Sequence, residues 1–181
     1  MTAKIIIAYA FSIVAMISIF IMSQQNNKNK LLIFKLVSDS CWAAHYFLLG
    51  AIGGVIPNFV GVFRDITFSQ RRKKKFFSGI YIPIFFIAAN IIIGAFTFSQ
   101  PINILPICAS VLATLSLWMA KPKLTKILLL PVFILFLIYD LSIDPISITG
   151  IVNQTIGIFS IILSFIISQI KRIKNKRTDD V

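Results

Sequence analysis

Long apolar stretches separated by short polar connections run through the whole chain. The stretches cover residues 4–23, 31–49, 51–69, 76–95, 104–120, 125–141 and 147–170. Each is close to the roughly 20 residues that a helix needs to cross the hydrocarbon core of a bilayer. Only helices and closed barrels satisfy the backbone in lipid, and these uniformly apolar stretches do not fit the alternating pattern of barrel strands. The pattern therefore predicts an all-α membrane protein with seven transmembrane helices.

The first stretch, KIIIAYAFSIVAMISIFIMS, has to be distinguished from a signal peptide. A signal peptide has an apolar region of about 7–15 residues and an A-x-A-like cleavage site. The stretch is longer than that, and no such site follows it. We therefore expect it to be retained as a helix.

Basic residues cluster in every second connection. The groups contain Lys28, Lys30 and Lys35; Arg71 to Lys75; Lys121, Lys123 and Lys126; and the segment KRIKNKR after the last stretch. The alternate connections, around GAIGG, TFSQPIN and LSIDPIS, contain no Lys or Arg. Seven helices place all the basic groups on one side of the membrane, which the positive-inside rule makes the cytoplasmic side. The predicted topology has the N-terminus outside and the C-terminus inside.

The composition agrees with a membrane protein, and the position of the positive charge agrees with contact with the lipid bilayer. Hydrophobic residues make up 57% of the chain and charged residues 13%, against about 45–50% and 25% in soluble domains. The net charge of +12 could suggest nucleic acid, but that would require a basic face beside aromatic or base-reading side chains. Here the charge lies next to the apolar stretches. We therefore expect the lipid bilayer as a partner, and no nucleic acid.

The chain offers little for metal or covalent chemistry. Its single histidine, His45, and its two cysteines, Cys41 and Cys108, have neither metal-ligand spacing nor a disulfide framework around them. We expect both cysteines to be small buried hydrophobes. No nucleophile stands in a recognisable motif with His45. The sequence therefore predicts no catalytic residue, no metal, no cofactor and no enzymatic activity.

A polar face runs along the second predicted helix, in the segment DSCWAAHYFLLG. In a helical projection, an arc of roughly 120° around Asp39 contains Lys35, Ser38, Trp42, His45 and Tyr46. Polar side chains in hydrocarbon turn toward the bundle interior or a wet cavity. Two interpretations stay open. A Lys35–Asp39 ion pair and interhelical hydrogen bonds could hold the bundle, or Trp42 and His45 could line a solute cavity.

Further polar residues extend this interior on the third and seventh predicted helices. Asn58 follows Pro57, and Asn153 lies in a stripe of small residues, so each is a candidate to contact a solute or another helix. Arg64 lies near RRKKK, and we expect it to snorkel to the cytoplasmic boundary as a topology anchor. Trp118 lies just before the basic KPK turn, so we expect it in the interfacial aromatic belt.

The two halves of the chain show a weak internal sequence similarity. Aligning residues 42–58 with residues 136–153 pairs Trp42 with Phe136, His45 with Tyr139, Tyr46 with Asp140 and, with one insertion, Asn58 with Asn153. Parallel repeats of this kind are a known transporter construction. The predicted organisation is a first three-helix repeat at 1–75, a linker helix at 76–100, and a second three-helix repeat with a basic tail at 101–181.

One stretch carries a family resemblance. FKLVSDSCWAAHYFLLGAIGGVIPNFVGVFRDITFSQRRKKKF resembles the first half of the YgjV family of bacterial inner-membrane proteins, through W-x-x-H-Y-x-L-x-G followed by Asn, Arg-Asp and a basic loop. LPICASVLATLSLWMAKPKL and LIYD resemble its second half. The resemblance implies a multi-pass protein of the bacterial inner membrane.

The three-plus-one-plus-three plan is also similar to that of the PQ-loop and SWEET superfamily, which includes carriers of sugars and vitamin precursors. The proline–glutamine dipeptide is absent, and Pro57-Asn58 and Pro131 are partial stand-ins. SWEET-like carriers have a pair of asparagines on equivalent helices, which Asn58 and Asn153 resemble. This similarity implies a small carrier for a polar, uncharged metabolite.

The expected substrate site lies between the two repeats. Its candidate residues are Asp39, Trp42, His45, Tyr46, Asn58, Tyr139 and Asn153. The alternative is a non-transporting membrane scaffold or interaction protein whose buried polar residues are structural. A homo-oligomer is compatible with either function.

Overall fold

The computed structural model describes residues 3–50, 52–71, 73–96, 98, 100–142 and 148–179, and only the backbone of 52–54 and 174–179. Within these residues the α-helices are α1 (Ala3–Gln24), α2 (Lys28–Leu49), α3 (Ile52–Ser69), α4 (Tyr81–Phe96), α5 (Ile104–Trp118), α6 (Pro122–Ser142) and α7 (Ile148–Asp179). Two short 3-10 helices, η1 (Lys75–Ser78) and η2 (Pro101–Asn103), precede α4 and α5. The prediction of an all-α protein with seven helices is confirmed.

Within the part of the chain that the structure describes, four segments are long and apolar enough to cross a membrane. They are α1, η2 with α5, α6, and the part of α7 from Ile148 to Ile173. The apolar α4 is shorter, at 16 residues. The helices α2 and α3 carry the charged residues Lys35, Asp39, Arg64 and Asp65 within their length. Length and hydropathy therefore support a multi-pass membrane protein that carries charged residues within some of its helices.

Local sequence signals explain where α2 begins and ends. The side chain of Asn27 accepts hydrogen bonds from the backbone N–H groups of Asn29 and Lys30, as an N-cap residue does. At the other end, Gly50 adopts φ 76°, in the left-handed region that glycine tolerates best. These two caps define where α2 begins and ends, and the polar residues Asp39, Trp42 and His45 lie between them.

The fourth helix begins later than the sequence predicted. Residues 76–78 belong to η1, and α4 starts at Tyr81 after Gly79, whose extended backbone (φ −70°, ψ 146°) ends the 3-10 turn. Pro83 lies in the first turn of α4, where a missing N–H costs little because those groups have no partner within the helix. By contrast, Pro57 and Pro131 lie inside α3 and α6.

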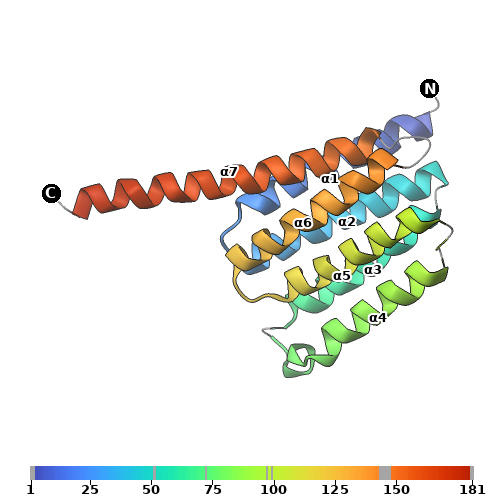
Figure 1. Ribbon diagram of the computed structural model, residues 1–181, viewed down its shortest axis with the longest axis horizontal. Coiled ribbons are helices and arrows are strands. Elements are labelled where there is room, and N and C mark those ends of the chain that lie inside the picture. Colours follow the sequence, from blue (N-terminus) through green and yellow to red (C-terminus); the bar gives the residue numbers. More distant parts are fainter. Residues whose placement is uncertain are drawn as a thin grey trace.

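The helices lie side by side, and each contacts the next one along the chain (Figure 1). Helix α2 packs against both α1 and α3, and α6 packs against both α5 and α7. The two groups meet where α1 contacts α7 and, less extensively, where α3 contacts α5, while α4 packs on α5. The Gln24 side chain donates to Ser160 O (3.0 Å) and Ser160 Oγ donates to Phe20 O (3.1 Å), which fastens α1 to α7.

One end of the bundle carries the basic connections. In Figure 1 the connections after α1, α3 and α5 lie at the same end as the C-terminal part of α7, which extends well past the other helices. The N-terminus lies at the opposite end. We call the first of these the basic end, because it holds Lys28, Arg71, the lysines at 73–75, Lys121 and Lys171.

The interior is mixed and the outer surface is apolar. Fully buried apolar residues such as Met22, Leu31 and Leu129 pack in one core. Buried beside them are Ser38, Thr125 and many other polar groups. Large apolar side chains instead cover the outside, as expected when the surrounding solvent is lipid, because lipid imposes no penalty on exposed Phe and Ile.

Small residues let the helices of the second group approach closely. An added Cβ at Gly157 of α7 would lie 2.7 Å from Phe133 Cε1 of α6, and one at Gly150 would lie 2.5 Å from Asp140 Oδ2. Real Cβ atoms do not come this near to other atoms, so a larger residue at either position would have to displace the Phe133 ring or the Asp140 carboxylate. The stripe of small residues on the last helix therefore serves close packing, as small-xxx-small patterns do.

We predict that Gly157→Val destabilises the protein, because its side chain would enter the space of the Phe133 ring. Overpacking of this kind costs about 1–3 kcal/mol. The measurement is the melting temperature of the purified protein in detergent. The control is Thr155→Val at an exposed position of the same helix, which should melt close to the wild type. Equal melting of the two variants would contradict the close contact of α6 with α7.

Candidate functional site

The polar face of α2 points into the bundle, as the sequence predicted. The exposed fractions of Ser38, Trp42 and His45 are 0%, 6% and 1%. On the opposite side of the same helix, Val37 and Phe47 are 38% and 71% exposed. The helix therefore has one polar side facing its neighbours and one apolar side facing outward.

Three residues of this face form an aromatic cluster with His45 at its centre. The His45 ring meets Trp42 edge-on (centroids 5.2 Å apart) and Tyr46 edge-on (5.2 Å), while Trp42 and Tyr46 stack at 5.6 Å. Tyr9 of α1 lies 6.1 Å from the same imidazole. We call Trp42, His45 and Tyr46 the aromatic cluster.

The imidazole of His45 is held by a backbone group of α1. Its Nδ1 lies 2.8 Å from the carbonyl oxygen of Ala8. A carbonyl only accepts, so Nδ1 carries the proton and donates it, and in the neutral ring Nε2 is left as an acceptor. This bond fixes both the tautomer and the orientation of the ring, and it joins α1 to α2.

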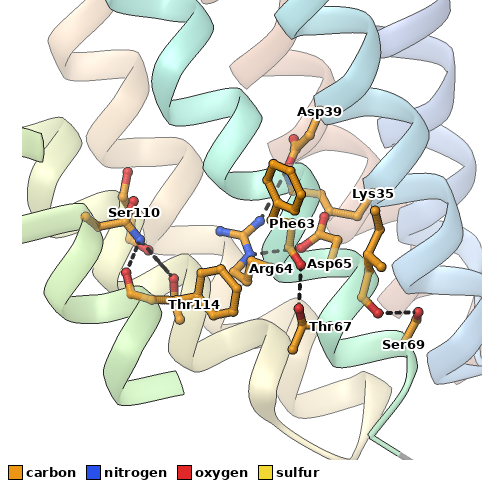
Figure 2. A network of polar contacts seen from close by, with 12 residues as sticks. Lys35, Asp39, Phe63, Arg64, Asp65, Thr67, Ser69, Ser110 and Thr114 are labelled. Carbon is orange, nitrogen blue, oxygen red and sulfur yellow. Dashed lines mark hydrogen bonds and ion pairs between the residues drawn. The ribbon is translucent and has the colours of Figure 1, made fainter. Parts of the chain in front are cut away.

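Nearer the basic end, a buried ionic network joins α2 to α3 (Figure 2). Lys35 forms the predicted ion pair with Asp39 on the same helix. Arg64 of α3 donates from Nη2 to Asp39 Oδ2 (3.2 Å) and from Nε to Asp65 Oδ1 (2.9 Å). The network thus contains two cations and two carboxylates, and its formal charges balance.

The prediction that Arg64 snorkels to the membrane boundary is wrong. The residue is only 5% exposed, and its guanidinium lies between two buried carboxylates. Snorkelling is favoured when no partner is available inside the bundle. Here Asp39 and Asp65 supply that partner, so the side chain turns inward.

Gly61 makes the contact between α2 and α3 possible. A Cβ at this position would lie 2.6 Å from Asp39 Oδ2 and 3.6 Å from Arg64 Nη2. Any larger residue would therefore displace the carboxylate from the guanidinium. The sequence alone gives no sign that Gly61 faces Asp39, because the two residues belong to different helices.

Tyr139 of α6, a candidate site residue, is half-buried. Its neighbour Asp140 is 8% exposed, and its Oδ2 accepts from Gln154 Nε2 at 3.4 Å. That Tyr139 shares a site with Tyr46 of α2 stays a prediction. Gln154 was not among the predicted site residues. It lies four residues after Gly150, hence on the same side of α7, and Gly150 also packs against Asp140.

Four buried polar atoms lack a hydrogen-bond partner among the described residues. They are Ser38 Oγ, Trp42 Nε1, Asp65 Oδ2 and Asn153 Oδ1. Buried polar atoms are nearly always bonded to protein, water or ligand, because an unmade bond costs about 1–3 kcal/mol. Two of them, the Trp42 indole and the Asn153 amide, belong to residues that the sequence nominated for solute contact.

The two asparagines differ in burial. Asn153 is 8% exposed on α7, while Asn58 on α3 is half-buried. That they face each other across the axis between the repeats stays a prediction. Asn58 directly follows the helix-internal Pro57, which removes one backbone donor from α3.

Two further side-chain predictions are wrong. Trp118 is 8% exposed and packs against Phe68 at 5.1 Å, so it belongs to the core and not to an interfacial belt. The Arg71 guanidinium lies 3.8 Å above its ring and donates to its carbonyl oxygen at 2.6 Å, which draws the indole inward. Cys108 is exposed and Cys41 half-buried, because both lie toward the outer sides of their helices.

We predict that Arg64→Gln lowers the free energy of unfolding by about 3–5 kcal/mol, as breaking a buried ion pair does. The reason is that Asp65, which is 0% exposed, would lose the cation that compensates its carboxylate. Chemical or thermal unfolding in detergent measures the loss. The double variant Arg64→Gln/Asp65→Asn should recover part of it, because the uncompensated charge is gone.

Lys75→Gln, an exposed basic residue near the same end of α3, is the control for loss of positive charge. It should change the stability very little. A loss in Arg64→Gln no larger than in this control would contradict the buried network.

Comparison with known proteins identifies the family of the chain. Searches of curated proteins and of solved structures give no match. The family model Imp-YgjV, described as a bacterial inner membrane protein, matches residues 6–175. That match spans nearly the whole chain, including all seven apolar stretches and the polar face of α2. The protein belongs to the YgjV family of bacterial inner-membrane proteins, and its apolar helices cross that membrane more than once.

Proposed function

We propose that this inner-membrane protein is a carrier for a small, polar, uncharged solute. Its site would lie between two three-helix units, α1–α3 and α5–α7, with α4 as the linker. Carriers built from repeats bind their solute near the middle of the membrane and work by moving one unit against the other. The basic end would face the cytoplasm, following the positive-inside rule.

Repeated packing supports the division into two units. In each unit the middle helix contacts both of its neighbours. The alignment that places Trp42 over Phe136 also places Asp39 over Phe133, and each of these two residues packs on a glycine of the following helix, Gly61 or Gly157. The two contacts are similar but one position out of register, because the alignment that pairs Asn58 with Asn153 places Gly61 over Ile156, next to Gly157. The partner of the glycine is charged in one unit and aromatic in the other.

The observation that carries the proposal is the pair of unpartnered atoms on opposite units. Trp42 Nε1 of α2 is a buried donor, and Asn153 Oδ1 of α7 is a buried acceptor. A neutral solute with hydroxyl or amide groups could satisfy both. The aromatic cluster beside Trp42 supplies the apolar wall that small-molecule sites usually have.

The charge distribution supports an uncharged solute. Lys35, Asp39 and Arg64 are paired with one another, so these three charges are not free to bind an ion. The buried carboxylate of Asp140 accepts a hydrogen bond from Gln154 and can accept further ones from a neutral solute. His45 is engaged with the Ala8 carbonyl through Nδ1. We therefore assign His45 and Tyr46 to the wall of the site, and we propose no catalytic role for either.

A scaffold without transport activity remains the second candidate, and one observation favours it. The residues of the aromatic cluster close against one another, and His45 bonds to α1, as expected if these groups only hold the bundle together. In a carrier the same contacts would belong to an occluded state. The two functions differ in whether any solute binds.

We predict that a screen of sugars, nucleosides, vitamins and amino acids finds a compound that raises the melting temperature in detergent. A ligand at 100 times its Kd adds about 2.7 kcal/mol to the stability. Trp42→Phe removes the indole N–H together with its five-membered ring but keeps an aromatic side chain, and Asn153→Ala removes the amide. Each should abolish the shift while the protein stays folded.

Asn90→Ala is the matched control for Asn153→Ala. Asn90 is a buried asparagine of α4 whose amide bonds to Phe86 O and Thr114 Oγ1, away from the proposed site. It should lower the melting temperature but keep the ligand shift. If no compound shifts the wild type, yet Trp42→Phe and Asn153→Ala melt lower, the scaffold becomes the better account.

A further inference from the structure

A recess with two basic residues on its wall lies at the basic end of the bundle. It has a volume of about 170 Å³. Its lining includes Lys28 at the start of α2, Phe68 of α3, Arg71 after α3, and Trp118 and Ala120 at the end of α5. The recess is therefore formed by helices of both three-helix units.

The two cations on its wall lack a carboxylate partner. Among the described residues, every ion pair involves Lys35 or Arg64, and none involves Lys28 or Arg71. Lys28 Nζ donates to Thr125 Oγ1 at 2.7 Å, which uses one of its three N–H groups. Arg71 donates through Nη1 to the Trp118 carbonyl, which leaves other donors of its guanidinium fork unused.

Burial makes this charge costly. Lys28 is 8% exposed and precedes the apolar stretch 31–49. Its burial lowers its pKa to about 7; Asp65 acts in the opposite direction from a distance, and Arg71 and Arg64 lower the pKa further. An anion in the recess would offset this penalty, because it favours the charged form of Lys28.

We propose that this recess binds a phosphate group, held between Lys28 and Arg71. Lysine offers a point charge and arginine a planar fork that matches two phosphate oxygens. Basic pockets between transmembrane helices on the cytoplasmic side take anionic lipid head groups. The phosphate could belong to a phospholipid or to a soluble phosphate ester, and this inference does not depend on transport.

The size of the recess agrees with a single phosphate group. It is far larger than the roughly 10–15 Å³ that one water molecule requires. It is also smaller than the about 300–1,000 Å³ of pockets that enclose whole small molecules. The apolar side of the wall, formed by Phe68, Leu32 and Leu117, suits the carbon atoms next to an esterified phosphate.

The test uses the full chain in detergent and three probes: phosphatidylglycerol, phosphatidylcholine and glycerol 3-phosphate. Thermal shift and native mass spectrometry measure binding. We expect the wild type to bind phosphatidylglycerol or glycerol 3-phosphate. Lys28→Gln and Arg71→Gln should each weaken that binding by about tenfold or more, since each removes a charge-assisted hydrogen bond.

Two controls separate the recess from the general positive charge of this end. Lys30→Gln and Lys74→Gln remove exposed lysines nearby and should change affinity by no more than about twofold. Ala120→Trp keeps both cations but fills the recess from an exposed position. It should block binding, and it keeps the test decisive if Lys28→Gln folds poorly.

The outcomes distinguish the source of the phosphate. Binding of phosphatidylglycerol alone, lost in the recess variants, identifies a lipid head group. Binding of glycerol 3-phosphate that is lost in the same variants identifies a soluble ester. Equal weakening by the recess and control variants, undiminished binding in Ala120→Trp, or no binding of any probe by the wild type would overturn the proposal.

Discussion

A polar group inside a membrane protein has no water to hydrogen-bond with, so it needs a partner within the protein. This constraint determines the arrangement of the bundle. Its clearest expression is the bond from Arg64 of α3 to Asp39 of α2. Each charge would be costly to bury alone, yet together with Lys35 and Asp65 they form a neutral set. The set fixes how α2 and α3 face each other, and Gly61 provides the space that it needs.

The same constraint arranges three kinds of polar group in order along α2. Lys28 begins the helix at the basic end, the paired charges of Lys35 and Asp39 follow, and the aromatic cluster lies beyond them. The paired charges therefore lie between a positively charged recess and the polar interior beside the aromatic cluster. This order is why we assign an anion to one end and an uncharged solute to the other.

Much of this architecture could be predicted from the sequence, because lipid makes its rules simple. Seven apolar stretches gave seven helices, and the position of Asp39, Trp42 and His45 on one arc correctly indicated a buried face. Side-chain direction was harder. Arg64 and Trp118 both lie near helix ends rich in positive charge, where snorkelling and belt positions are the usual expectation.

Both side chains instead turn into the bundle, because they find partners that are distant in the sequence. Asp39 lies 25 residues from Arg64, and Arg71 lies 47 residues from Trp118. No local pattern reports such contacts. The recess at the basic end was missed for the same reason, since it exists only where α2, α3 and α5 come together.

The central claim is that the polar interior opens to a solute. Its most direct test is the accessibility of a cysteine at Asn153, which is only 8% exposed. Asn153→Cys would be made with Cys41→Ala and Cys108→Ser, and labelled with a membrane-impermeant maleimide in cells and in inverted vesicles. A carrier predicts labelling from both sides of the membrane, as the two units move. A folded variant that is labelled from neither side would contradict the account.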